Sequence, residues 1–227
     1  MRHAVYCGDM VTPQEPPMDG RRARRERSRV AVIDAVFALV RDGKVPPTAE
    51  DIAERAGVSV SLIFRNFDGL DDMQRQAFDV FRERYVHLFD PAVDAAASRP
   101  ERVARHVRVR LDLLTVAGPM MHFARQRTLE CQPMAEGVGR GRSQLSDQAR
   151  AHFASETAQL SPAEAANLLA VIDALTSPEA YEVLRAAHGR SDRQISRLWI
   201  CSLTAILDGW PGLSTDDDTE LDKEDKA

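Results

Sequence analysis

Six arginines lie among the nine residues from Arg21 to Arg29, and Glu26 is the only acid among them. The guanidinium group suits phosphate, because it offers several N–H donors on a permanent positive charge. The cluster therefore predicts phosphate neutralisation along a nucleic acid, or insertion of arginine into a minor groove. The alternative is an exposed, solubilising start to the apolar helix expected from Val30 to Val40. The candidate DNA contacts in this basic arm are Arg22, Arg24, Arg25 and Arg27.

Residues able to perform catalysis or to hold a metal are scattered along the chain. Cys7, Cys131 and Cys201 form no Cys-x-x-Cys pair, the six histidines lack close ligand spacing, and Gly-x-Ser-x-Gly is absent. We therefore expect no enzyme activity, no cofactor and no metal site. Cys131 lies in a polar stretch and is a candidate redox-sensing thiol, with an incidental cysteine as the alternative.

The segment from Thr48 to Phe67 has the pattern of two short helices joined by a tight turn. Thr48 can cap the first helix, and Asp51 three positions later completes a capping-box-like start. Gly57 permits the turn, and Ser59 can cap the second helix. This pattern predicts a helix-turn-helix, the unit that many proteins use to read a DNA groove. A structural helical hairpin is the alternative.

The stretch from Val30 to Met73 resembles the N-terminal domain of the tetracycline-repressor (TetR) family. The family motif runs approximately Thr-Thr, Asp-Ile-Ala, Ala-Gly-Val-Ser, a small residue, Leu-Tyr, His-Phe and then Lys. The matching residues here are Thr48, Asp51, Ile52, Ala53, Ala56, Gly57, Val58, Ser59, Ile63, Phe64 and Phe67. The resemblance implies an all-α protein, with a three-helix DNA-binding domain followed by a helical ligand-binding and dimerisation domain.

The chain departs from the family motif at several polar positions. Phe64 replaces the usual Tyr that donates its hydroxyl to a phosphate, so one phosphate contact should be missing. Asn66 replaces the family's His, Leu70 replaces its Lys, and Ser61-Leu62 replaces Gly followed by Thr or Ser. Arginine suits guanine and asparagine suits adenine in the major groove. We expect DNA contacts from Thr48, Ser59, Val60, Ser61, Leu62, Phe64, Arg65 and Asn66.

Past Pro91 the pattern is helical almost everywhere, and no run shows convincing strand alternation. A helix is predicted over about 100–116, ending at Gly118-Pro119, and a second over about 119–131. A third should begin near Arg142 and end by Leu160. The intervening 137–142 run, Gly-Val-Gly-Arg-Gly-Arg, superficially resembles a phosphate-binding loop, but without a preceding strand a flexible basic loop is the better interpretation.

Two later helices have complete start signals, Ser161-Pro-Ala-Glu164 and Ser191-Asp-Arg-Gln194. Ser177-Pro178 should kink or restart the first of them. The family resemblance implies that two such helices from each subunit form a four-helix dimer interface. Packing within their own domain is the alternative, and both arrangements can coexist. The predicted interface residues are Leu168, Ile172, Leu175, Ile195, Leu198, Trp199, Ser202 and Ile206.

In the TetR family a small molecule enters the C-terminal domain, changes the spacing of the two reading heads and releases DNA. The resemblance implies the same coupling here, with the helix that ends near Phe89 as the lever. The chemistry of the candidate lining indicates an apolar effector with one polar or anionic end, although Met and Phe at helical spacing are often ordinary core. The effector-binding candidates are His106, Arg110, Leu113, Leu114, Met120, Met121, Phe123 and Met134.

The charge is segregated along the chain, which has a formal net charge of −5. Residues 214–227 alone carry a net −5, so the remainder is neutral overall while its start is strongly basic. We expect a disordered extension over 1–20, a DNA-binding domain over 21–73, an effector-binding and dimerisation domain over 74–210, and a disordered acidic tail over 211–227. The sequence lacks a secretory signal and an apolar run near 18 residues, so we expect a cytoplasmic protein.

Together these features predict a DNA-binding transcriptional regulator. The leading hypothesis is a homodimeric, ligand-responsive repressor that binds a pseudo-palindromic operator and is released by a small apolar effector. Activation of transcription is also open, because the position of the operator decides whether binding represses or activates. The alternative is a TetR-like interaction protein with weakened DNA binding, favoured by Phe64 and Leu70.

Overall fold

The computed structural model describes residues 20–89 and 96–210, and every regular element in these ranges is helical. The predicted all-α class is therefore confirmed. The disorder expected over residues 1–20 and 211–227 lies outside the described residues except at Gly20, which begins the first helix and corrects that boundary. No helix in the described ranges has the length and apolar character needed to cross a bilayer.

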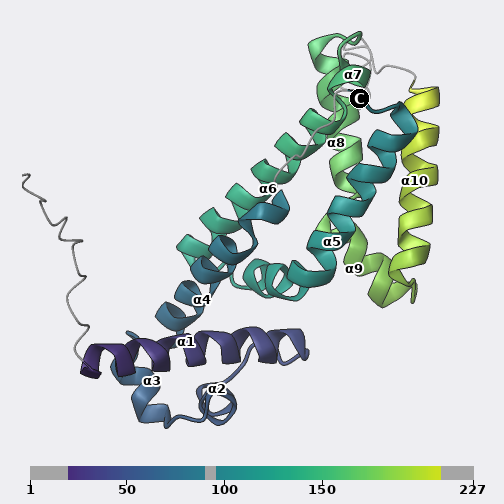
Figure 1. Cartoon of the computed structure of the whole chain (residues 1–227). Helices are drawn as coiled ribbons and strands as arrows, with labels where there is room; N and C mark the ends of the chain where they lie inside the picture. The colour runs from purple at the N-terminus through teal and green to yellow at the C-terminus, as the bar shows by residue number, and fades with distance from the viewer. Residues whose placement is uncertain (1–19, 90–95, 211–227) are drawn as a thin grey trace, which may run out of the picture.

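Three helices form the lower part of the molecule in Figure 1: α1 (Gly20–Arg41), α2 (Ala49–Ala56) and α3 (Val60–Asn66). Local signals set the bounds of α2 and α3 as predicted. Thr48 and Asp51 form a capping box at the start of α2, and Gly57 ends it in the left-handed region at φ 65°. The Ser59 side chain then accepts a hydrogen bond from the Leu62 N–H and caps α3.

The basic arm is not a separate segment before the helix, because α1 begins at Gly20 and includes the whole arginine run. Arginine has high helix propensity, so nothing in Arg21–Arg29 stops a helix that the apolar residues after it already require. The buried side of α1 starts beyond the run, at Val32 and Ile33. The arginines therefore extend a packed helix into solvent.

Helix α4 (Leu70–Tyr85) continues into a short 3-10 helix, η1 (Val86–Phe89), as the predicted amphipathic helix reaching Phe89. It leaves the lower helices and rises into the upper bundle (Figure 1). Met73 and Ala77 are completely buried, and Phe78 and Phe81 nearly so. The helix thus belongs to both parts of the molecule.

Helix α5 runs unbroken over Arg99–Gln126, so the predicted break at Gly118-Pro119 is wrong. Proline costs an interior hydrogen bond, but tertiary packing on both sides of it outweighs that local preference. Leu113, Leu114 and Ala117 are buried before Pro119, and Phe123 and Ala124 after it. One continuous helix buries both sets.

Helix α6 spans Gln132–His152, which corrects two predictions. The 137–142 run is helical and not a flexible loop, and the helix begins at Gln132 and not near Arg142. Its end before Leu160 is as predicted, and the short α7 (Ala154–Thr157) follows it. Burial of Met134 before the glycine-rich run and Leu145 after it fixes the segment between them as helix. The glycines lower helix propensity without preventing the helix.

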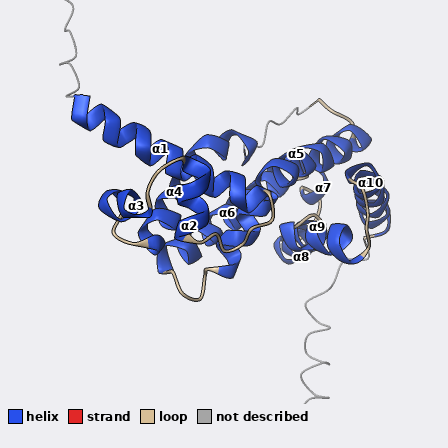
Figure 2. Ribbon diagram, turned by 90° about the horizontal axis from the view of Figure 1, so that it is seen from below, coloured by secondary structure: helices blue, strands red, loops and turns tan. Residues whose placement is uncertain are grey.

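The remaining elements are α8 (Pro162–Leu175), α9 (Pro178–Glu182), a π-helical turn η2 (Val183–Ala187) and α10 (Asp192–Gly209). The capping boxes predicted at Ser161 and Ser191 are both present, and the restart at Ser177-Pro178 is confirmed. In Figure 2 these helices lie with α5 on one side of the molecule, away from α1–α3.

Two apolar cores stabilise the fold. The first joins α1–α4 to the later half of α5 and to α6, and it includes Ile52, Ile63, Phe78 and Phe123. The second joins the first half of α5 to α8 and α10 around Trp199. Helices α1–α3 therefore share one core with the helices above them.

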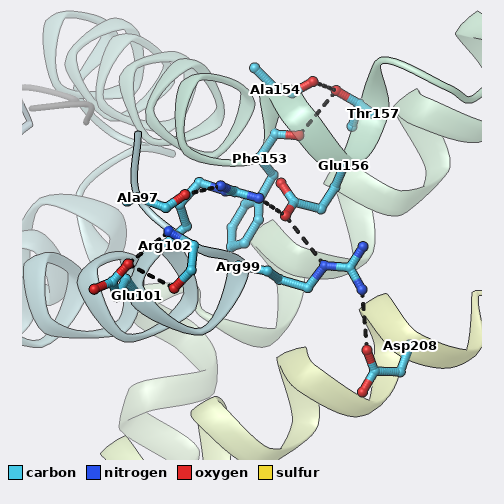
Figure 3. Close-up of polar contacts among 10 residues, drawn as sticks. Ala97, Arg99, Glu101, Arg102, Phe153, Ala154, Glu156, Thr157 and Asp208 are labelled. Atoms are coloured by element: carbon cyan, nitrogen blue, oxygen red, sulfur yellow. Dashed lines mark hydrogen bonds and ion pairs between the residues drawn. The ribbon is translucent and has the colours of Figure 1, made fainter. Parts of the chain in front are cut away.

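The end of the bundle farthest from α1–α3 is held by a buried carboxylate (Figure 3). Glu156 of α7 accepts from Arg102, and it lies 3.5 Å from Nε of Arg99. Arg99 also pairs with Asp208 near the end of α10, at 3.2 Å. This network links the start of α5 to α7 and α10.

Candidate DNA interface and ligand cavity

Helix α3 presents a small exposed face made of Ser61, Phe64 and Arg65. Ser59, also exposed, has its hydroxyl within 3.0 Å of the Ser61 hydroxyl while it caps the helix. Thr48 is exposed at the start of α2, where its side chain is engaged in the capping box. Among the predicted DNA contacts on the α2–α3 unit, these five side chains are exposed.

Asn66 does not belong to that face. Only 6% of the residue is exposed, and its carbonyl oxygen accepts a hydrogen bond of 3.1 Å from Nη1 of Arg29. Adenine recognition by this side chain is therefore contradicted. The last turn of α3 rotates Asn66 onto α1, whereas Arg65 points to solvent.

Phe64 is 52% exposed. Val60 and Leu62 are partly buried, and Val60 contacts the first core. The exposed chemistry of α3 is thus one guanidinium, one aromatic ring and two hydroxyls counting Ser59. An exposed phenyl ring can contact the methyl group of thymine but cannot donate to a phosphate.

The four predicted arginines of the basic run, Arg22, Arg24, Arg25 and Arg27, are all exposed on α1. They occupy the first turns of the helix, where the macrodipole adds partial positive charge. This end of the molecule therefore concentrates positive potential from side chains and backbone together.

Arg29 has a different role from its neighbours. Its guanidinium donates to Gln76 of α4 and to the Asn66 carbonyl, and it lies 5.1 Å from the ring centroid of Phe67. These contacts join α1, the end of α3 and α4. Arg29 fixes the end of α3 against α1 and α4, and its guanidinium is already engaged in these contacts.

Aromatic contacts join α1 to α4 at a second point. Phe37 and Phe81 pack edge to face with ring centroids 6.3 Å apart, and the guanidinium of Arg84 lies over Phe37. Arg84 also pairs with Asp34 at 3.1 Å. A displacement of α4 near Phe81 therefore acts directly on α1.

Phe81 also lines a cavity of about 490 Å³. Its walls come from α4, η1, α5, α6 and α9, and its volume falls within the range typical of small-molecule sites. The apolar lining includes Phe78, Phe81, Val86, Phe89, Met121, Val138 and Leu145. The polar lining includes Asp79, Arg82, Glu83, Arg125, Arg142, Gln144 and Glu179.

A separate polar cluster lies buried between α5, α6 and α8. The Thr176 hydroxyl donates to the Ile172 carbonyl at 2.8 Å, so it accepts from Nε2–H of His106 at 3.2 Å. Nδ1 of His106 is then an acceptor, and it receives the Nδ1–H of His152 at 3.0 Å. Nearby, Arg110 donates to Asp173 at 2.8 Å and to the Leu145 carbonyl at 2.6 Å.

This cluster is held in the neutral-histidine state. Burial, together with the charge of Arg110, puts the pKa of His106 well below its ordinary value and lowers the pKa of His152 to about 4. Burial also lowers the pKa of Arg110 to about 10, while Asp173 opposes that shift. Arg110 remains charged at neutral pH and completes a buried ion pair.

Helices α8 and α10 present exposed apolar positions as well as buried ones. Leu168, Ile172, Ile195 and Trp199 are buried in the second core, so these four predicted interface residues pack within their own chain. Leu198 is 43% exposed, and Leu175, Ser202 and Ile206 are partly buried. Val171 and Cys201 are exposed on the same two helices.

No protein-family model and no curated protein matches the chain. Solved structures do match it over most of its length. A transcriptional regulator from Rhodococcus sp. Rha1 is 18% identical, with a TM-score of 0.60, covering 82% of this chain and 96% of that one. A protein described as a TetR-family transcriptional regulator, from Rhodococcus sp., is 16% identical with a TM-score of 0.55, covering 80% and 99%.

A third match, described as a transcriptional regulator from Streptomyces coelicolor A3(2), is 22% identical with a TM-score of 0.53, covering 80% of this chain and 98% of that one. Together these likenesses decide the architecture. The chain has the TetR fold.

Within the TetR fold, the predicted effector residues lie in four places. Met121 alone lines the cavity. Leu113, Met120, Phe123 and Met134 are buried in the first core, Leu114 is buried in the second, and His106 and Arg110 belong to the polar cluster. The cavity-lining residues of α4 and α6, including Phe78 and Arg82, were missed. A usable signal for the α4 residues is the helical spacing of Phe78, Phe81, Arg82 and Phe89. The α6 side of the cavity is hidden from the sequence because residues 137–142 are predicted to be a loop.

The TetR fold also places few ligating side chains together. In the described ranges, no three His, Cys, Asp or Glu side chains gather as metal ligands would. Cys131 is partly buried at the start of α6, and Cys201 is exposed on α10.

Proposed function

We propose that this protein is a transcriptional regulator that binds a pseudo-palindromic DNA operator as a homodimer. The observation that carries the proposal is the exposed Ser61, Phe64 and Arg65 face of α3 beside the arginine-rich start of α1. One helix of seven residues reads only a few base pairs, so two readers in symmetric register supply the specificity that one lacks. The DNA-binding unit spans residues 21–73, and the effector-binding and dimerisation unit spans 74–210.

The dimer surface in this proposal is the exposed side of α8 and α10. Val171 of α8 and Leu198 of α10 are its largest exposed apolar side chains, and Cys201 and Ser202 follow Leu198 along α10. Large apolar groups on a surface mark sites of association when they gather. The buried Trp199 and Ile172 support this surface from behind.

The proposed effector is a small, largely apolar molecule in the α4–α6 cavity, and its binding releases DNA, so the protein acts as a repressor. Phe81 lines the cavity, and its ring also packs against Phe37 of α1. A ligand that displaces α4 therefore changes the position of α1 and of the reader that Arg29 fastens to it. This is a two-state coupling between ligand and operator.

A second candidate function is a TetR-fold interaction protein with weakened DNA binding. The exposed phenyl ring of Phe64 and the buried Asn66 favour it, because both reduce the polar contacts that α3 offers. Protein partners would then contact the same α3 face. In either function the protein works without catalysis, inside the cytoplasm.

The deciding experiment is fluorescence anisotropy of the purified full-length protein with duplex DNA from beside its own gene. A scrambled duplex of equal length is the control, and both are titrated at several salt concentrations. We expect selective binding to the native duplex, with a steep salt dependence from the α1 arginines. Weak and equal binding to the native duplex, to the scrambled duplex and to promoter fragments from the whole genome would favour the interaction protein.

A further inference from the structure

We propose that the α4–α6 cavity binds an aromatic or other flat apolar molecule carrying one carboxylate, and that Arg82 binds this carboxylate. The inference rests on the proposed function only where it calls that ligand the effector. Binding itself is a separate property of the cavity.

The apolar part of the cavity is aromatic on the α4 side. Phe78 and Phe81 lie one turn apart, with ring planes 17° from parallel and centroids 6.0 Å apart, and Phe89 follows on η1. Met121 of α5 and Leu145 of α6 lie among the other lining residues. Such a surface favours a flat ring, because aromatic groups pack well on one another and Met adapts to the remaining shape.

Most charges in the lining are already neutralised by ion pairs. Asp79 pairs with Arg75 at 3.3 Å. Glu179 pairs with Arg125 at 3.3 Å and with Arg142 at 2.9 Å. Burial raises the pKa of Glu179, but hydrogen bonds from its own backbone and from Arg142, with the charge of Arg125, outweigh that and leave the pKa lowered. Glu179 is therefore ionised and occupied.

Arg82 is the exception among the lining cations. It has no hydrogen bond or ion pair within residues 20–89 and 96–210, although its side chain is partly buried. A guanidinium that has lost part of its hydration without gaining an acceptor is an unfavourable state that an anionic ligand relieves. A carboxylate is the best match, because it accepts two parallel N–H donors.

Gln144 supplies a second donor near Arg82. It faces α4 from α6, and both residues line the cavity and the surface recess beside it. Its amide, like Arg82, has no hydrogen-bond partner in the described part of the chain. The carboxylate would thus sit at the mouth between α4 and α6, with the ring directed inward to the phenylalanines.

Glu83 is the feature that argues for a cationic ligand instead. It also lines the cavity without a partner among the described residues, but it is exposed and so keeps most of its hydration. An exposed carboxylate gains little from an ion pair, whereas a partly buried guanidinium gains more. The geometry therefore points to an anion, and a cationic ligand is an outcome that the test can detect.

The test uses three probes of matched shape: naphthalene-2-carboxylate, 2-naphthylmethanol and 2-naphthylmethylammonium. Isothermal titration calorimetry on the full-length protein gives the Kd of each. We expect the carboxylate to bind at least about tenfold more tightly than the alcohol, and the ammonium to bind most weakly. An alcohol or ammonium that binds as tightly as the carboxylate would overturn the proposal, and so would absence of binding by all three.

Two variants test whether Arg82 is the residue that binds the carboxylate. Arg82→Gln should weaken carboxylate binding about tenfold and leave alcohol binding unchanged. Arg140→Gln is the matched control, since Arg140 lies on α6, lines only the neighbouring recess and pairs with Glu136. Equal carboxylate affinity in Arg82→Gln and wild type would overturn the assignment, and circular dichroism melting shows that each variant is folded.

DNA binding separates this proposal from the proposed function. If the carboxylate binds through Arg82 but leaves the anisotropy of a protein–DNA complex unchanged, the ligand class stands and the effector role fails. If the protein binds no DNA at all, the calorimetric result still decides the ligand class.

Discussion

Gly137 of α6 lies so close to Phe78 of α4 that a β-carbon on Gly137 would be 2.3 Å from Cε1 of the ring. Both residues line the cavity, and this is the closest approach between α4 and α6 at any glycine of the described chain. The glycine in the second turn of α6 is therefore a packing requirement. It allows the two helices to meet beside the cavity.

Gly137→Ala should destabilise the protein by about 1–3 kcal/mol, because the Phe78 ring must move out of a packed core. Gly139→Ala is the matched control on the same helix, since nothing lies within 4 Å of its added β-carbon. That variant should gain roughly 0.5–1 kcal/mol from improved helix propensity. Urea unfolding measures both, and equal stabilisation by the two substitutions would contradict the close contact.

Arg27 and Arg29 are two residues apart on α1 but should behave differently. Arg27→Ala removes an exposed cation, so it should weaken DNA binding, lower the salt slope by about 1 and leave the free energy of unfolding unchanged. Arg29→Ala removes the bond to the Asn66 carbonyl and the contact with Phe67, and should cost about 1–3 kcal/mol of stability. Anisotropy and urea unfolding on both variants check the pair. The assignment fails if Arg27→Ala is the destabilising substitution.

Phe64→Tyr should tighten operator binding about three- to tenfold. The ring is half-exposed on α3, so an added hydroxyl extends toward DNA and can donate to a phosphate. Phe64→Ala, which removes the ring, is the comparison, and anisotropy at one salt concentration measures both. If the tyrosine variant gains nothing, the missing hydroxyl is not the weakness of this reader.

The protein should become less stable as pH decreases through the range set by the two buried histidines, His106 and His152. Their folded-state pKa values lie below the ordinary 6.5, with His152 at about 4, so between these values the unfolded chain binds protons that the folded chain does not. The free energy of unfolding therefore decreases as pH decreases from 6.5 toward 4, by at most about 1.4 kcal/mol per pH unit for each histidine.

Urea unfolding at about pH 7, 6 and 5 measures that slope, in a range above most carboxyl titration. Replacing one member of the pair, His152→Gln, should make the slope shallower, whereas replacing the exposed His188 by Gln should leave it as in wild type. The same slope in both variants would show that the acid sensitivity originates elsewhere.

Leu198→Glu should dissociate the proposed dimer, because it places a charge on the exposed apolar side of α10. Leu129→Glu is the control, since Leu129 is 96% exposed at the α5–α6 turn and lies outside α8 and α10. Sedimentation equilibrium should give a monomer for the first variant and a dimer for wild type and the second. A dimer that survives Leu198→Glu would place the interface on another surface.

The sequence determined the local boundaries of this fold. Side-chain caps at Thr48, Ser59, Ser161 and Ser191 and the left-handed Gly57 lie where their spacing predicted, because a cap depends on residues within one helical turn. The exposed arginines and the α2–turn–α3 unit followed from the same short-range rules. The family resemblance extended this to the whole architecture, and the TetR fold confirms it.

Only the tertiary structure decided the features that depend on contacts between residues far apart in the chain. Packing against two cores carried α5 through Pro119 and α6 through its glycines, which local propensity alone would have broken. The same long-range contacts turned Asn66 toward Arg29, buried His106 with His152, and left Arg82 without a partner among the described residues, beside a row of phenylalanines. Burial and pairing depend on residues far apart in the chain. The position of the Arg82 charge at the cavity therefore follows from the packing of α4 with α6, which local sequence does not specify.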